Sequence, residues 1–338
     1  MLFISSSLLV SVLPLLSYAK SNRSRSHTSI AKRYQTPHKN YVLDVKYQGA
    51  DFFTEWDFFH WDDPTNGQVN YVNLEDATNR GLAYVQHDNS TVFGVDSTND
   101  LPLNAKRDSV RISSKRRFSG GLFIADFNAM PHGCGTWPAY WSTGPEWPKA
   151  GEIDVIEGVN QQIANQYTMH TVDEGCSLQE VTTDLKTFTA NLIHERCASK
   201  EGDNSGCAFK DSDEASYGKG LNEAGGGVFV HLWDQRGIKF WFFNRNSIPH
   251  DIVAGNPDPS SWGLPKAHLA STRCDVAKYF YEHVLVINTS LCGSYAGNVY
   301  QDQGCPGTCA ERIMSAGNFV DAKWNVNHIS VYQPAQSQ

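Results

Sequence analysis

The chain has 338 residues, of which 40% are apolar, 12% aromatic and 19% charged, and its formal net charge is −8. This length and composition favour one large globular domain or two small ones and argue against disorder beyond the N-terminus. The excess of acidic residues argues against nucleic acid as a partner, because an acidic protein repels polyanions.

Residues 1–19 predict a secretory signal peptide, because an apolar stretch of about ten residues ends in small residues at the spacing that a signal peptidase accepts. A membrane anchor would need about 20 apolar residues, and no later segment approaches that length. We therefore expect a secreted, extracellular protein without a membrane anchor. The glycosylation sequons at Asn89 and Asn288 are compatible with this interpretation.

Residues 20–33, KSNRSRSHTSIAKR, hold five of the 28 Lys and Arg residues and no acidic residue. A basic arm that binds nucleic acid is one interpretation of such a run. Behind a signal peptide, we favour a pro-segment that is cleaved after the dibasic pair Lys32-Arg33. Its removal would leave a more acidic mature chain from residue 34 to residue 338.

From about residue 42 onward, short apolar or alternating runs are bounded by Gly, Pro, Asn and Asp, as expected for strands. No linker, charge block or repeat marks a domain boundary, so residues 34–338 are predicted to form one all-β sandwich. A short helix is expected at 310–319, and 173–226 is predicted to be an extended loop region. The predicted strands lie at 69–73, 82–86, 109–113, 121–127, 228–233, 238–243, 284–288 and 328–332.

All eight cysteines follow residue 33, and an even number in a secreted protein indicates disulfides. Cys197 with Cys207 and Cys305 with Cys309 are candidate local pairs, although eight cysteines allow 105 pairings. Zinc is the alternative, but no histidines lie near these cysteines at the spacing of a zinc finger.

Residues 151–157, GEIDVIE, place three carboxylates on a predicted strand. Glu152 and Asp154 would project from one face, whereas Glu157 would lie on the opposite face of a regular strand. A β-bulge with one extra residue between Asp154 and Glu157 would return Glu157 to that face, as bulges do beside active sites. The alternative is an ordinary solvated strand face.

Two carboxylates about 5–5.5 Å apart are what a retaining glycosidase needs. One attacks the anomeric carbon, and the other protonates the leaving oxygen and then activates water. Their proximity raises the pKa of one of them, because both cannot ionise at low cost. A third acid between them would tune this difference through hydrogen bonds.

Four stretches carry a family resemblance: GEIDVIEGVN (151–160), GCGTWPAYW (133–141), YTMHT (167–171) and NGQVNYV (66–72). They resemble glycoside hydrolase family 16, in particular the secreted fungal endo-β-1,3(4)-glucanases, or laminarinases. The resemblance runs from about residue 40 to 333. It implies a concanavalin A-like β-jelly-roll sandwich with a concave glycan-binding cleft and a bulge in the strand of the E-x-D-x-x-E signature.

The resemblance also implies roles for the acidic residues. Glu152 matches the family nucleophile, Asp154 the assisting acid and Glu157 the general acid/base. His170, in YTMHT on the next strand, matches a histidine near the acid/base. Without this context, a single His between Met and Thr is more often a strand residue with no special role.

Sugar rings stack on indoles while their hydroxyl groups seek polar partners. Trp137 and Trp141 are four residues apart and would share one face of a strand. Trp262, in a Ser/Gly/Pro-rich loop, resembles a tryptophan that lines the cleft, and Arg111 and Asn70 match family positions at the cleft. Core packing of the tryptophans, and ordinary strand pairing of Arg111 and Asn70, are the alternatives.

Trp147 is a further loop candidate for the cleft. The chain departs from its relatives at 225–234, GGGVFVHLWD, where His231 or Trp233 would alter the subsites and hence the chain-length preference. The expected activity is hydrolysis of internal β-1,3 bonds in β-glucan, and of β-1,4 bonds in mixed-linkage glucan. A cell-wall transglycosylase and a non-catalytic glucan-binding protein are the alternatives.

The sequence contains no nucleotide or redox-cofactor motif, so we expect that no cofactor is required. Some family members hold a structural calcium ion, and the sequence leaves that site undecided. The expected partner is the β-glucan substrate, and we expect the protein to be a monomer.

Overall fold

A computed structural model describes residues 41–178, 187–200 and 202–335. The predicted signal peptide (1–19) and pro-segment (20–33) lie outside these residues. The described residues belong to one compact unit that spans His38–Gln338. No helix among them is long and apolar enough to cross a membrane.

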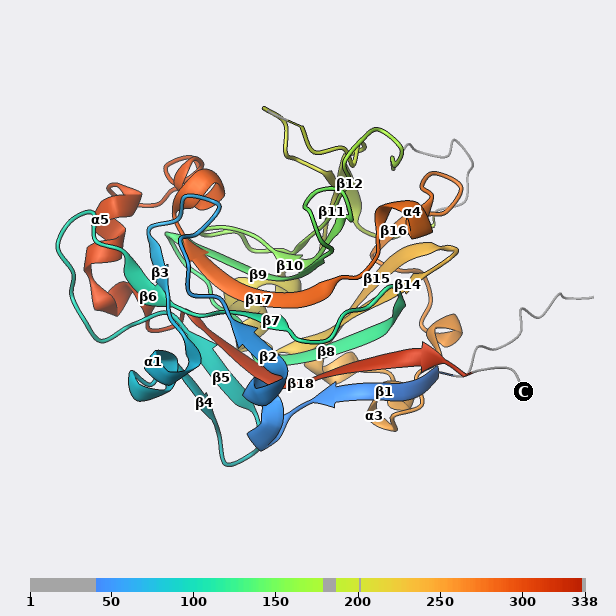
Figure 1. The fold of residues 1–338 in the computed structure, drawn as a ribbon, viewed down its shortest axis with the longest axis horizontal. Coiled ribbons are helices and arrows are strands. Elements are labelled where there is room, and N and C mark those ends of the chain that lie inside the picture. Colours follow the sequence, from blue (N-terminus) through green and yellow to red (C-terminus); the bar gives the residue numbers. More distant parts are fainter. Residues whose placement is uncertain (1–40, 179–186, 201, 336–338) are drawn as a thin grey trace, which may run out of the picture. The chain divides into compact units, whose positions relative to one another are not determined.

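Two antiparallel sheets form the architecture (Figure 1). In sheet A the order is β16 (Ala267–Ala270), β15 (Gly237–Asn244), β14 (Gly227–Asp234), β8 (Gly121–Ala129), β18 (Lys323–Pro334), β5 (Thr91–Gly94) and β4 (Ala83–Val85), with β1 (Tyr41–Tyr47) also paired to β18. In sheet B it is β12 (Asn191–His194), β13 (Cys207–Lys210), β11 (Gln166–His170), β10 (Glu152–Glu157), β9 (Thr136–Thr143), β17 (Val284–Leu291), β7 (Arg111–Ser114) and β2 (Trp56–Phe58). A parallel pair, β3 (Val69–Tyr71) and β6 (Arg107–Ser109), stands apart from both sheets.

Helices are short and connect the strands. The α-helices are α1 (Leu74–Asn79), α2 (Gly218–Glu223), α3 (His250–Val253), α4 (Val276–Tyr279) and α5 (Cys309–Met314). The 3₁₀-helices are η1 (Gly49–Glu55), η2 (Glu214–Ser216), η3 (Arg245–Ser247), η4 (Pro259–Ser261) and η6 (Ala316–Phe319), and η5 (Gly293–Gly297) is a single π-turn.

The all-β sandwich is confirmed, and so is each predicted strand within one or a few residues, except the strand at 109–113. That run is divided between β6, which ends at Ser109, and β7, which begins at Arg111 in another sheet. The helix expected at 310–319 is present as α5 followed by η6. Its start is fixed by a capping box, in which the Thr308 side chain accepts from the Glu311 N–H and the Glu311 carboxylate accepts from the Thr308 N–H.

The loop predicted for 173–226 is wrong in part. This region contains β12, β13 and α2, in addition to the residues that lie outside the described ranges. β13 has only four residues and pairs with β11, with Phe209 opposite Tyr167. So short a run becomes a strand through its neighbours in the sheet, and its own sequence gives little signal.

The hydrophobic core lies between the two sheets because their strands alternate. In β8, Phe123, Ala125 and Phe127 join the core that also holds Ile153 and Ile156 of β10. The intervening β8 residues, such as Leu122 and Ile124, join a second cluster on the outer face of sheet A. The acidic residues of β10 therefore face outward from sheet B, away from sheet A.

Four disulfides use all eight cysteines, so the zinc alternative is wrong. The predicted Cys197–Cys207 pair is confirmed. The predicted Cys305–Cys309 pair is wrong. Cys305 bonds to Cys134, just before β9, and Cys309 bonds to Cys292, just after β17. The bonds are Cys134–Cys305, Cys176–Cys274, Cys197–Cys207 and Cys292–Cys309.

The two sequons differ in accessibility. Asn288 is only 7% exposed in β17, and its side chain binds Trp141 and Tyr71. The folded chain therefore cannot present Asn288 as a glycan acceptor. Asn89 is exposed in the turn between β4 and β5, where a glycan would have room.

Candidate active site

The bulge that the sequence predicts is present in β10. Against β11, Asp154 pairs with Thr168 and Glu157 with Gln166, so three steps on β10 match two on β11. Against β9 the register shifts at the same place, between Asp154 and Ile156. The extra residue returns Glu157 to the face of Glu152 and Asp154. All three carboxylates thus project from the outer face of sheet B.

The bulge leaves backbone groups without strand partners, and Asn165 satisfies two of them. Its Oδ1 accepts from the N–H of Glu157 at 3.1 Å, and its Nδ2 donates to the carbonyl of Val155 at 2.7 Å. Asn165 is itself fully buried, and its N–H donates to Ser216 Oγ at 2.9 Å. One side chain therefore holds the backbone that aims Glu157.

Glu152 stands at the start of β10, opposite His170 on β11. Trp147, from the loop before β10, donates its indole N–H to Glu152 Oε2. This hydrogen bond shows that the loop candidate Trp147 reaches the carboxylates, although 48% of the residue is exposed. A hydrogen bond from an indole favours the ionised form of Glu152.

Asp154 lies between the two glutamates and is 2% exposed. Its Oδ2 is 3.5 Å from Nε2 of His170 and has no hydrogen-bond partner. The other ring nitrogen of His170, Nδ1, is 2.9 Å from Ser199 Oγ, which orients the imidazole. A buried carboxylate oxygen without a partner favours the protonated form of Asp154, because burial penalises the charged form.

Glu157 is surrounded by groups that donate to it. Trp137 donates its indole N–H to Glu157 Oε1 at 3.2 Å, and the Trp137 ring meets Tyr295 edge-on at 5.4 Å between centroids. Thr168 also hydrogen-bonds to Glu157, and Lys210 of β13 contributes a nearby positive charge. These contacts fix the carboxylate at the end of the bulge.

The electrostatics of the cluster favour protonated carboxyls. Burial is the main cause that raises the pKa of Glu152, Asp154 and Glu157 above their ordinary values. Asp154 further raises the pKa of Glu152, and Glu157 further raises the pKa of Asp154, because like charges repel. Such a cluster keeps a proton available at a pH where isolated carboxyls are ionised.

Trp141 and Arg111 lie on the same face of sheet B. Trp141 pairs with Asp154 in the β9–β10 register and donates its indole N–H to Asn288 Oδ1 at 2.7 Å. The Arg111 guanidinium carbon is 5.2 Å from the centre of the Trp141 ring and 4.6 Å from that of Phe59. Both predicted residues are therefore brought beside the carboxylates, and both are partly exposed.

The prediction that Trp262 lines the cleft is wrong. Trp262 packs edge-on against Trp241 and Phe243 of β15, with ring centroids 5.6 and 5.7 Å away, and its indole N–H donates to Asp251 at 2.8 Å. It belongs to the cluster on the outer face of sheet A. The ring packs on the apolar outer face of β15, in sheet A, whereas the carboxylates lie on sheet B.

The prediction for Asn70 is also wrong. Asn70 lies in β3 opposite Asp108 of β6, and its side chain donates to Asp108 at 2.6 Å. Asp108 also binds Arg80. Because side chains alternate along a strand, the neighbouring Tyr71 points the other way, and its hydroxyl accepts from Asn288 at 3.3 Å. Ordinary strand pairing, the alternative for Asn70, is what the structure shows.

His231 and Trp233 do not shape the outer face of sheet B, contrary to the prediction. Both are buried, at 1% and 2% exposed. The His231 ring stacks on Phe123 with centroids 4.2 Å apart, and Trp233 belongs to the core between the sheets. The alternation of β14 directs both side chains inward.

The sequence analysis did not assign several residues that surround the carboxylates to the site, and it identified one of them, Asn288, only as a glycosylation sequon. Asn165, Thr168, Ser199, Lys210, Asn288 and Tyr295 all contact the cluster or its immediate neighbours. Thr168 carried a signal, because it lies two residues before His170 and shares its face of the strand. Lys210 and Ser199 are joined to the site by strand pairing and a buried hydrogen bond, which a single sequence does not reveal.

Glu152, Asp154 and His170 are also the one grouping of three His, Cys, Asp or Glu side chains with metal-ligand spacing in the part of the chain that the structure describes. This grouping coincides with the carboxylate cluster described above. The expectation that no cofactor is required stays a prediction. Whether the protein holds a structural calcium ion stays undecided.

Comparison with known proteins gives one family. The model described as "XgeA-like, catalytic GH16 domain" matches residues 56–332. A protein named probable endo-1,3(4)-beta-glucanase from Aspergillus clavatus is 40% identical over 339 aligned residues, which cover 97% of this chain. The alignment covers 51% of that relative, so the chain spans about half of its length.

Two solved structures are similar in both sequence and fold. Laminarinase 16A from Phanerochaete chrysosporium, with β-glucans in its donor and acceptor sites, is 34% identical, with a TM-score of 0.82. An elongating GH family 16 β-1,3-glucosyltransferase is 38% identical, with a TM-score of 0.81. Each match covers 87% of this chain and all of the other chain.

Proposed function

The chain belongs to glycoside hydrolase family 16, in its XgeA-like group, and we propose that it is a retaining endo-glycosidase of β-glucans. It hydrolyses internal β-1,3 bonds, and β-1,4 bonds in mixed-linkage glucan, through a covalent glycosyl-enzyme. The family, the glycoside hydrolase class and the jelly-roll fold are the premises. The substrate, the stereochemistry and the residue roles are the proposal.

One observation carries this proposal: the bulge in β10 places Glu152 and Glu157 on one face with Asp154 between them. A regular strand would have turned Glu157 into the core. Two carboxylates on one face, one donating a proton and the other attacking, are the minimum for retaining glycoside hydrolysis. The named laminarinase and glucanase relatives support a β-glucan as the substrate.

In the first step, Glu152 is ionised while Glu157 keeps its proton, and the nearby His170 and the Trp147 N–H favour this state by lowering the pKa of Glu152 against the effect of burial. A Glu152 oxygen bonds to the anomeric carbon as the glycosidic C–O bond breaks. The proton of Glu157 goes to the leaving oxygen, so that the departing glucan ends in a neutral hydroxyl group. The Trp147 N–H stabilises the charge on Glu152 before the attack. The raised pKa of Glu157 keeps its proton in place until it is needed.

In the second step, Glu157, now ionised, takes a proton from water as the water oxygen bonds to the anomeric carbon. The Glu152–carbon bond breaks, which regenerates both carboxyls in their starting states. Two inversions at the anomeric carbon give net retention. Asp154 and His170, whose Oδ2 and Nε2 atoms are 3.5 Å apart, act on the charges of the glutamates: Asp154 raises the pKa of Glu152, and His170 lowers the pKa of both glutamates.

A second candidate function is transglycosylation, in which a glucan hydroxyl replaces water in the second step. The similarity to an elongating β-1,3-glucosyltransferase favours this candidate. The two functions share every residue of the mechanism above. They differ in how well an acceptor sugar competes with water at the same carbon.

Product analysis of the purified protein on laminarin, mixed-linkage β-glucan and agarose tests the proposal, with an added oligosaccharide acceptor. Short oligosaccharides from laminarin are expected, and proton NMR in the first minutes should show new reducing ends in the β form. Elongated acceptor products would identify a transglycosylase.

Initial α-anomers would overturn the retaining mechanism. Binding to laminarin without any product would instead indicate a glucan-binding protein. Glu152→Ser should abolish turnover and keep binding to glucan. A substantial rate that survives in this variant would remove Glu152 from the role of nucleophile.

We also propose that the protein acts outside the cell. Four disulfides support this proposal, because such bonds persist in oxidising compartments. Western blotting of the culture medium and of cell lysate, with and without residues 1–19, tests it. Equal retention of both forms in the cell would contradict secretion.

A further inference from the structure

Among the nine tryptophans, two are highly exposed: Trp147 at 48% and Trp61 at 64%. Trp147 binds Glu152, as described above. Trp61 lies in the segment between β2 and β3, which Figure 1 shows running beside the upper left part of the sandwich, close to β3. A single exposed apolar side chain needs no ligand to explain it, so the case for Trp61 rests on its contacts with the residues beside the carboxylates.

A continuous series of contacts leads from the carboxylates to Trp61. It starts at Trp141, which pairs with Asp154, and passes through the Arg111 guanidinium to the ring of Phe59. Phe59 then meets Trp61 edge-on, with ring centroids 5.3 Å apart. Trp61 is thus the far end of a row of aromatic and guanidinium groups that begins at the carboxylate cluster.

The orientation of Trp61 leaves one ring face available. His60 stacks on one face, with centroids 4.3 Å apart and planes inclined by 23°, and Phe59 covers an edge. With these contacts made, 64% of the residue is still exposed. A flat, exposed indole face matches the C–H face of a pyranose ring, whose hydroxyl groups stay hydrated.

The segment that carries Trp61 is held firmly at both ends. On one side, the Phe59 N–H donates to the Arg111 carbonyl at 2.9 Å. On the other, the buried Asp63 carboxylate accepts from Ser290 Oγ of β17 at 2.8 Å and from the Gly67 N–H at 2.9 Å. Trp61 is therefore presented in a fixed place, which reduces the entropy lost on binding.

We propose that Trp61 is a stacking platform for a glucosyl unit of the β-glucan chain several units away from the bond that is cleaved. This inference rests on the proposed function and specifies its substrate: a glucan long enough to reach from the carboxylates past Trp141 and Arg111. The platform sets a chain-length preference, and shorter oligosaccharides do not use it.

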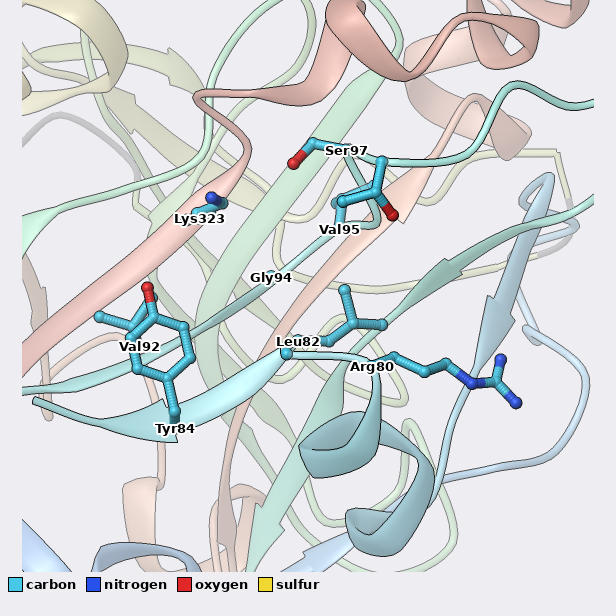
Figure 2. Close-up of a pocket in the computed structure, with 10 residues that line it drawn as sticks. Arg80, Leu82, Tyr84, Val92, Gly94, Val95, Ser97 and Lys323 are labelled. Atoms are coloured by element: carbon cyan, nitrogen blue, oxygen red, sulfur yellow. The ribbon is translucent and has the colours of Figure 1, made fainter.

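Tyr84 provides a matched control. It is also an exposed aromatic residue, at 43%, but it lies on β4 of sheet A. Figure 2 shows Tyr84 near Val92 and Lys323, beside a cavity of about 80 Å³ whose lining includes Arg80 and Gly94. Neither Tyr84 nor this cavity belongs to the series of contacts that ends at Trp61.

The test measures binding in a Glu152→Ser background, so that no substrate is consumed. Calorimetry with laminari-oligosaccharides of two to eight units would compare the affinities of four proteins. These are the Glu152→Ser parent and the same protein with Trp61→Ala, Trp61→Phe or Tyr84→Ala added. For the long oligosaccharides, Trp61→Ala should weaken binding about threefold to tenfold, as expected for the loss of one stacked ring. Short oligosaccharides should bind unchanged, Trp61→Phe should restore most of the affinity, and Tyr84→Ala should have no effect.

Kinetics in the active protein provide an independent measurement. Stacking far from the reacting carbon is equal in ground state and transition state, so Trp61→Ala should raise KM for laminarin and leave kcat unchanged. A wild-type protein that cleaves laminarin while Trp61→Ala binds every length normally would overturn this inference alone. A wild-type protein that neither binds nor cleaves laminarin would overturn both this inference and the proposed function.

Discussion

At the scale of single residues, the carboxylate cluster is shaped by which neighbours donate to which glutamate. Glu152 receives an indole N–H from Trp147, and Glu157 receives one from Trp137. Glu157 additionally has the charge of Lys210 nearby. The two glutamates therefore have different surroundings, which is what allows two carboxyls to take two roles.

The role of Glu157 can be isolated with Glu157→Gln. We expect the rate on laminarin to fall by about 10²–10⁴-fold, because the leaving oxygen no longer receives a proton. Aryl glycosides with good leaving groups need no acid, so glycosyl-enzyme formation from them should be much less affected. A stopped-flow burst measures that step, and an equal loss on both substrates would contradict the role.

Burial sets the raised pKa of Glu157, and Lys210 should move the alkaline limb of the pH profile by lowering that pKa. Burial lowers the pKa of Lys210 to about 8, and below that pH its charge lowers the pKa of Glu157. The general acid must be protonated, so activity falls as pH rises through the raised pKa of Glu157. Lys210→Met removes the charge, so the alkaline limb of kcat/KM should move upward in pH.

Lys239→Met is the matched control for this shift. Lys239 is a half-buried lysine of β15 in sheet A whose pKa burial also lowers, and its charged neighbours are Arg236 and Asp234. Its pH profile should match that of the wild type. An alkaline limb that stays in place or moves downward in Lys210→Met would show that Lys210 does not act on Glu157.

At the scale of elements, the bulge in β10 depends on a side chain outside the strand. Asn165→Ala would leave the Glu157 N–H and the Val155 carbonyl unpaired and buried. Each unsatisfied group costs about 1–3 kcal/mol, so the free energy of unfolding should fall measurably. Because the same backbone aims Glu157, kcat should fall by on the order of 10²-fold, the cost of a misplacement of about 1 Å.

Asn222→Ala separates these two effects. The Asn222 side chain accepts from the Met130 N–H and donates to the Met130 carbonyl, both at 2.9 Å, so it binds a backbone segment in the same way. Denaturant unfolding should show similar losses in the two variants, whereas only Asn165→Ala should lose kcat. Equal activity in both variants would mean that the bulge keeps its shape without Asn165.

At the scale of the whole molecule, the disulfides join segments that are far apart in sequence. Cys134 lies just before β9, the strand that carries Trp137 and Trp141, and its partner Cys305 lies 171 residues further along the chain. Cys197–Cys207 closes a separation of only 10 residues. The two bonds thus restrict the unfolded chain to very different extents.

Paired substitutions to alanine should reveal this difference. The chain-entropy model gives roughly 5 kcal/mol for the Cys134–Cys305 loop and roughly 3 kcal/mol for the Cys197–Cys207 loop. Urea unfolding should therefore show the larger loss for the long loop. Equal losses, or the reverse order, would show that unfolded-chain entropy does not govern the stabilisation.

The amino-acid sequence by itself determined the features that depend on local pattern. Alternation and turn residues indicated the strands. If Glu152, Asp154 and Glu157 share one site, their spacing requires a bulge, because side chains on a strand repeat every two residues. Proximity in the chain suggested the pair Cys197–Cys207, which is present, and also the pair Cys305–Cys309, which is not.

Only the tertiary structure decided which sheet and which face each aromatic or polar residue joins. Trp262 suits an exposed loop by its neighbours, yet it lies on sheet A because the apolar side of β15 is there. Asn70 and Tyr71 are adjacent, and the pairing of β3 with β6 sends only Tyr71 toward Asn288. Lys210, Asn165 and Trp61 reach the site through strand pairing, a buried amide and a loop held to β17. Such contacts join residues that are distant in sequence, so a local sequence pattern cannot predict them.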